Sequence, residues 1–159
     1  MLHSVYPAFV RGRGAVGLLI LRLVVGAAFV LHGWGKIGSP GGMTAWMPAG
    51  APVPGFLQAA AALSEFGGGA LLILGLLTPV AAFFLACTMI VAIGTYHLPA
   101  GHPFVNLTGG PSYELAAGYL AAVLALLLAG PGKLSLDALL FDRRSARPGP
   151  APVQDTYRP

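Results

Sequence analysis

The stretch from Phe56 to Leu76, FLQAAAALSEFGGGALLILGL, decides the fold class of this chain. A run of about 20 mainly apolar residues is long enough to cross the hydrocarbon core of a bilayer as an α-helix. Glu65 lies in the middle of this run. A carboxylate at that depth costs several kcal/mol unless it is paired, neutralised or hydrated, and it marks a functional site by default. Glu65 is therefore the first candidate functional residue.

Three further apolar segments have a similar length, so that the chain holds four in all, at residues 15–34, 56–76, 79–96 and 113–129. Lipid offers no partner to unpaired backbone groups, and all four segments are therefore predicted to be helices. The connection between the second and third is so short that these two should form an antiparallel hairpin. The predicted fold class is all-α: a polytopic membrane protein built as a bundle of four transmembrane helices.

Composition and charge agree with this class. Of the 159 residues, 56% are apolar and only 9% are charged, and the mean hydropathy is +0.77, whereas soluble domains have about 25% charged residues. The formal net charge is +4, but the basic residues gather near the two ends, which argues against nucleic-acid binding and predicts cytoplasmic termini. We expect a cytoplasmic flank (1–14), a membrane domain (15–141) and a disordered cytoplasmic tail (142–159), with Arg11, Arg13, Arg143, Arg144 and Arg147 on the cytoplasmic side.

The single cysteine, Cys87, falls within the third apolar segment. One cysteine can form neither an internal disulfide nor a paired-thiol redox centre. The chain is therefore not expected to be a membrane thiol oxidase of the kind that passes electrons through cysteine pairs. Cys87 is interpreted as a small buried apolar residue.

A second charge lies inside an apolar segment, because Arg22 is roughly 10 Å from the start of the first helix at 1.5 Å per residue. The same arithmetic places Glu65 at nearly the same depth. An ion pair between Arg22 and Glu65 would neutralise both groups within the bundle, and it could be functional or serve only to fix the helix register.

Other polar side chains are predicted to share one layer at the outer face. His32 and Lys36 are four residues apart and so lie on one face of the first helix, while the remaining members come from the third and fourth segments: His97, His102 and Glu114. Such a layer could move protons, bind an anion or a polar ring, or hold a metal. No metal site is predicted, since metal-ligand spacings are absent and Lys36 would repel a cation. Haem ligation by His32 and His97 has no further support in the sequence.

The chain resembles the DoxX family of small four-helix membrane proteins. The resemblance covers about Val16 to Leu140 and rests on several motifs in order: Arg22 with Gly26 and Phe29, the run HGWGK at 32–36, Glu65 followed by glycines and by LILGLLT at 72–78, a histidine ending the third segment, Tyr113-Glu114, and GPGKLSLD at 130–137. The residues that match the polar pattern of the family are Arg22, His32, Lys36, Glu65, Glu114 and Asp137.

The resemblance implies a multi-pass protein of the bacterial plasma membrane, in contact with the lipid bilayer and associated with oxidoreductase systems. These systems include a thiosulfate–quinone oxidoreductase and complexes that handle oxidative or thiol stress. The chain would be at most a subunit of such an enzyme. A quinone needs protons at two carbonyl oxygens when it is reduced, so His32 or His97 is predicted to bind a carbonyl and Glu65 or Glu114 to exchange protons.

Three functions remain open at this point. The first is an accessory subunit that binds a quinone and works with a redox enzyme partner. The second is a non-catalytic assembly or anchoring subunit, in which the buried charges specify packing. The third is a small proton- or solute-conducting protein with a relay at mid-membrane depth.

Overall fold

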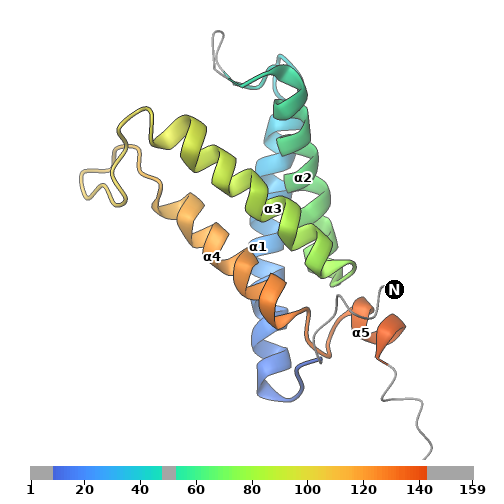
Figure 1. Cartoon of the computed structure of the whole chain (residues 1–159). Helices are drawn as coiled ribbons and strands as arrows, with labels where there is room; N and C mark the ends of the chain where they lie inside the picture. Colours follow the sequence, from blue (N-terminus) through green and yellow to red (C-terminus); the bar gives the residue numbers. More distant parts are fainter. Residues whose placement is uncertain (1–8, 48–52, 143–159) are drawn as a thin grey trace, which may run out of the picture.

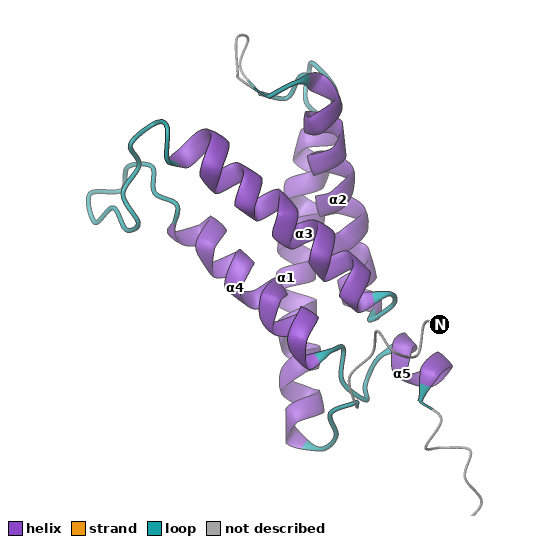
Figure 2. Cartoon of the chain, in the orientation of Figure 1, coloured by secondary structure: helices purple, strands orange, loops and turns teal. Residues whose placement is uncertain are grey.

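The structure is a computed structural model that describes residues 9–47 and 53–142, and every regular element in these residues is a helix (Figure 2). The predicted all-α class is confirmed for this part of the chain. The elements in chain order are α1 (Arg13–Ile37), α2 (Gly55–Leu74), α3 (Thr78–Ala92), the π-helical η2 (Ile93–His97) that continues α3, α4 (Glu114–Ala129) and the short α5 (Leu136–Phe141). The predicted disordered tail lies outside the described residues, except for Asp142.

Three helical stretches are long and apolar enough to cross a membrane: α1, α2, and α3 together with η2. The fourth apolar helix, α4, is shorter, with 16 residues. Many large apolar side chains face outward from these helices, as contact with lipid requires; they include Ile20, Val24, Leu31, Phe56, Phe83, Phe84, Ile90, Leu115 and Leu128.

The four long helices form two pairs (Figure 1). In this view α1 lies alongside α2, and α3 and α4 run side by side and cross the first pair obliquely. The short α2–α3 turn and α5 lie at one end of the bundle, which we call the turn end. The described parts of the first connection, 38–47 and 53–54, and the connection 98–113 lie at the other end, which we call the loop end.

Glycines set the register between α1 and α2. A Cβ atom on Gly26 would lie 2.7 Å from the carbonyl oxygen of Gly69, and one on Gly69 would lie 2.6 Å from that of Gly26. Gly33 is similarly close to the backbone of Phe66. Small residues allow such close backbone approach, and the resulting van der Waals packing favours helix association in lipid. This register brings the C-terminal turn of α1 beside Glu65.

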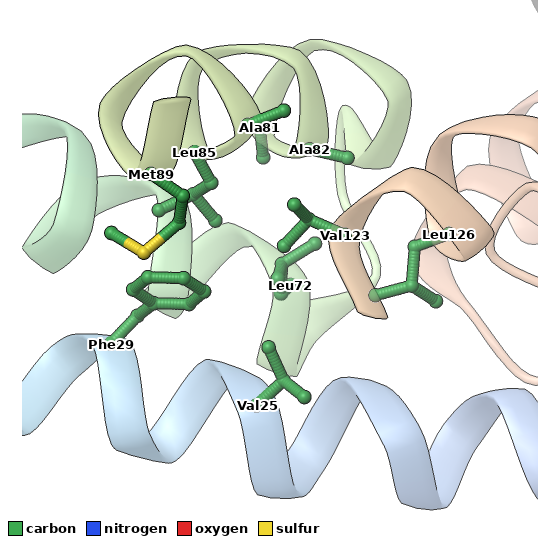
Figure 3. Close-up of a cluster of buried hydrophobic side chains, with 10 residues drawn as sticks. Val25, Phe29, Leu72, Ala81, Ala82, Leu85, Met89, Val123 and Leu126 are labelled. Carbon is green, nitrogen blue, oxygen red and sulfur yellow. The ribbon is translucent and has the colours of Figure 1, made fainter. Parts of the chain in front are cut away.

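The apolar core lies where the two helix pairs cross, and all four long helices contribute to it (Figure 3). The ring of Phe29 packs against Tyr119 of α4 with 5.1 Å between ring centroids. The other buried members come from each helix in turn: Val25, Leu72, Ala81, Ala82, Leu85, Ala86, Met89, Val123 and Leu126. The interior of the bundle is therefore apolar at this crossing. A charged group buried in the bundle needs a partner, because burial of an unpaired charge is costly.

Candidate functional site

A buried ion pair joins α1 to α2 near the loop end. The ammonium of Lys36 donates to Glu65 Oε1 at 2.5 Å. The Glu65 side chain is only 3% exposed and that of Lys36 is 20% exposed. Lys36 also lies over the ring of Trp46, 4.5 Å from its centroid, in a cation–π contact. The carboxylate therefore has a charged partner even though it lies within a membrane-spanning helix.

The predicted ion pair between Arg22 and Glu65 is wrong. Arg22 is fully buried and donates instead to the carbonyl oxygens of Leu72, at 3.2 Å, and Leu134. The glycine contacts between α1 and α2 place Arg22 at the C-terminal end of α2, where helix carbonyls have no partner within the helix and carry partial negative charge. The guanidinium of Arg22 therefore binds those carbonyl oxygens, and Lys36 pairs with Glu65.

At the turn end, Asp137 provides a negative charge close to Arg22. Its carboxylate is fully buried and accepts from the backbone N–H groups of Leu77 at 2.7 Å and Thr78 at 2.8 Å. These groups begin α3, so the carboxylate caps that helix. Asp137 also interacts electrostatically with Arg22. The contacts of the two residues thus connect α5 and the α2–α3 turn to α1.

A cavity of about 480 Å³ opens between α2 and α3, beside the Lys36–Glu65 pair. Its volume falls within the range typical of small-molecule sites. The walls are mostly apolar, with a few polar side chains besides the ion pair. The lining residues include the ion pair itself, Trp46 from the first connection, Ala61 and Ser64 from α2, and Cys87 and Thr88 from α3.

The first connection lines one side of this cavity and is hydrogen-bonded to one residue of α2, Gln58, through its backbone carbonyl and its side-chain amide. Trp46 Nε1 donates to the Gln58 carbonyl oxygen at 3.0 Å, and the backbone N–H of Met47 donates to Gln58 Oε1 at 3.0 Å. Gln58 Nε2 in turn donates to the Val53 carbonyl oxygen at 2.9 Å. Our sequence reasoning missed Gln58, although an amide in an otherwise apolar helix was a signal that could have identified it.

The side chains predicted to form one outer layer fall into three groups. Lys36 belongs to the ion pair. His32 is exposed and packs edge-on against Tyr119, at 6.0 Å between centroids, while the exposed Glu114 lines a second hollow of about 540 Å³ that Tyr119 also lines. His97 lies instead with His102, with 3.1 Å between their Nδ1 atoms.

These side chains therefore do not form one polar site, although a shared layer at the outer face stays a prediction. The two helix pairs cross obliquely (Figure 1). Lys36 contacts Glu65 of α2, whereas His32 contacts Tyr119 of α4 and His97 contacts His102. Neither His32 nor His97 lines the cavity between α2 and α3. Among the described residues, no group of three or more His, Cys, Asp or Glu side chains is arranged to hold a metal ion.

The fold and this geometry define a small all-helical membrane protein with an ion pair buried beside an interhelical cavity. The sequence profile of the DoxX family matches residues 17–98. The chain belongs to the DoxX family, as the sequence motifs predicted.

Curated relatives support this assignment. Inner membrane protein YqjF of Escherichia coli (strain K12) is 33% identical over 125 residues, which cover 79% of this chain and 92% of that protein. Inner membrane protein YphA of the same organism is 31% identical over 76% of this chain and 87% of that protein. A Bacillus subtilis (strain 168) relative named "Putative oxidoreductase CatD" is 32% identical over 79% of this chain and 88% of that protein.

No solved structure matches the chain significantly. The family assignment and the inner-membrane relatives confirm the predicted location, a multi-pass protein of the bacterial plasma membrane.

Proposed function

We propose that this chain is an accessory subunit of a membrane redox system and that it binds a quinone in the cavity between α2 and α3. The observation that carries the proposal is the buried Lys36–Glu65 pair on the wall of a mostly apolar cavity of about 480 Å³. A quinone needs apolar walls for its ring and tail and a few placed polar groups for its oxygens. The relative named as an oxidoreductase adds support from outside the structure.

The polar groups of the cavity replace the histidines as candidate quinone contacts. We assign contact with the quinone oxygens to Lys36 and Glu65, since His32 and His97 do not line the cavity. The ammonium of Lys36 would stabilise negative charge on a reduced oxygen, and Glu65 would exchange protons with it. Electron transfer is assigned to a redox enzyme partner, because the single Cys87 cannot form a paired-thiol centre of its own.

Cavity filling tests this function directly. Ala61 lines the cavity, whereas Ala27 on α1 is exposed toward lipid and does not line it. Ala61→Trp should weaken quinone binding by about tenfold or more, because overpacking a site typically costs about 1–3 kcal/mol. Ala27→Trp adds the same indole on the lipid-facing surface and should leave binding unchanged. Native mass spectrometry of each protein released gently from its membrane measures the bound quinone.

A wild-type protein that carries only phospholipid would contradict the quinone proposal. The assembly or anchoring function would then be favoured, because the buried network around Arg22 and Asp137 suits a purely structural role. Equal loss of quinone in both tryptophan variants would show that the quinone binds outside this cavity.

We also propose that α4 is the fourth span and that both termini lie in the cytoplasm. At 1.5 Å per residue α4 is about 24 Å long, somewhat shorter than the roughly 30 Å of a hydrocarbon core. Arg11 precedes α1 and Arg13 is its first residue, both at the turn end, and residues 98–112 include no Lys, Arg, Asp or Glu. The positive-inside rule then puts the turn end in the cytoplasm.

Reporter fusions check this topology. Alkaline phosphatase fused after Pro159 should be inactive, and the same enzyme inserted in the connection 98–113 should be active, because it folds to an active form only outside the cytoplasm. The reverse pattern would invert the orientation, and activity at both sites would show that α4 does not span the membrane.

A further inference from the structure

The second oxygen of the Glu65 carboxylate has no partner. Oε1 accepts from Lys36, but Oε2 is buried without a hydrogen bond in the part of the chain that the structure describes. A buried acceptor without a donor is costly, and more so when it belongs to a charged group. Because Glu65 lies on the cavity wall, a donor supplied by a ligand would relieve this cost.

Two donors beside Glu65 on the cavity wall, Lys36 and Thr88, already have acceptors. The ammonium of Lys36 already donates to Glu65, lies over the ring of Trp46 and is partly exposed. The hydroxyl of Thr88 has two acceptors within reach, Ser64 Oγ at 3.1 Å and the carbonyl oxygen of Phe84 at 3.0 Å. Among the described residues that line the cavity, Glu65 Oε2 is the side-chain atom that is buried without a hydrogen-bond partner, and it is an acceptor.

The two redox states of a quinone differ in this respect. The oxidised form offers only carbonyl acceptors, whereas the reduced form, the quinol, carries hydroxyl groups that both donate and accept. The apolar walls contact ring and tail alike in both forms and do not distinguish them. We propose that the cavity selects the quinol over the quinone, with a quinol hydroxyl donating to the carboxylate of Glu65. The inference rests on the proposed function and adds to it the redox state of the ligand.

Calorimetric titration of the purified full-length protein in nanodiscs tests the selection. The probes are a short-chain benzoquinone and the matching benzoquinol, the latter kept reduced without oxygen. The quinol should bind about tenfold or more tightly than the quinone, which is the effect of one additional buried hydrogen bond to a charged group.

A matched pair of variants assigns the selection to Glu65. In Glu65→Gln the side-chain amide offers its own N–H donors, so the preference should fall to about equal binding or reverse in favour of the quinone. Glu114→Gln makes the same change at a carboxylate that does not line the cavity, and the preference should remain.

The outcomes separate the two proposals. Quinone binding as tight as quinol binding in the wild type overturns the selection and leaves the proposed function standing. A preference that survives in Glu65→Gln overturns the assignment to Glu65. Failure of the wild type to bind either form overturns the selection and the quinone function together. The wild-type ratio decides the selection even if Glu65→Gln does not fold.

Discussion

Replacing Lys36 with methionine should lower the free energy of unfolding by about 3–5 kcal/mol, the usual cost of removing one partner from a buried ion pair. Methionine has a similar length and keeps contact with Trp46, but it removes the charge that neutralises Glu65. The carboxylate, 3% exposed in the folded protein, would then be buried without a counter-charge. Denaturant unfolding in a mild detergent, followed by circular dichroism, measures the change.

The double variant Lys36→Met/Glu65→Leu separates the buried charge from lost packing. With both charges removed, stability should return to near the wild-type value or exceed it, because apolar replacement of a whole buried pair is often neutral or stabilising. Arg11→Met is the control for removal of a cation alone. The Arg11 side chain is 59% exposed and lies 3.5 Å from Asp142, whose 6% exposed carboxylate also pairs with Lys133. Because Asp142 keeps this second cation, removal of the exposed Arg11 charge should cost only about 0–1 kcal/mol. Equal losses for Lys36→Met and Arg11→Met would contradict the buried-pair interpretation.

The fold class was predictable because the lipid environment leaves few choices. Apolar segments about 20 residues long must become helices in a bilayer, and the short link after Leu76 forces a hairpin. The same physics identified Arg22, Lys36 and Glu65 as costly charges that need partners. Each of the three has buried or partly buried partners in the structure.

The pairing of those charges was not predictable from depth. Partners follow from the register between α1 and α2, and that register depends on contacts such as those of Gly26 with Gly69, which no hydrophobic pattern encodes. The cavity likewise depends on tertiary contacts. The Trp46 ring, which lies against Lys36, is held to α2 by its hydrogen bond to Gln58. The sequence thus identified candidate residues, but it did not show which of them contact one another.

Asp137 is the clearest example of a role that required the structure. It follows a Gly-Pro-Gly stop in the sequence and lies in a helix of only six residues, which would suit a surface position. Instead its carboxylate is fully buried beneath the α2–α3 turn, whose Leu77 has a positive φ of 49°. A non-glycine residue in this region is strained. The hydrogen bond that the Leu77 N–H donates to Asp137 helps to hold the strained turn in place.

Asp137→Ala should therefore lower the free energy of unfolding by about 3–5 kcal/mol, as expected when a buried charged partner is removed. The change removes the acceptor of two backbone N–H groups at the start of α3, and it takes the nearby negative charge from the fully buried Arg22. Asp137→Asn keeps one oxygen acceptor and should lose less. Denaturant unfolding in detergent measures stability, and hydrogen exchange at Thr78 should rise first.

Ser135→Ala distinguishes this network from the stability of α5 itself. Ser135 Oγ caps α5 by accepting from the N–H of Ala138 at 3.1 Å, and it lies in the same segment as Asp137. Loss of a helix cap costs about 0.5–2 kcal/mol, so Ser135→Ala should be clearly milder than Asp137→Ala. If the buried cation accounts for part of the larger loss, Arg22→Met/Asp137→Asn should be less destabilised than the sum of its two single changes, because neither charge is then left alone. Strict additivity would show that Asp137 acts on the α2–α3 turn and independently of Arg22.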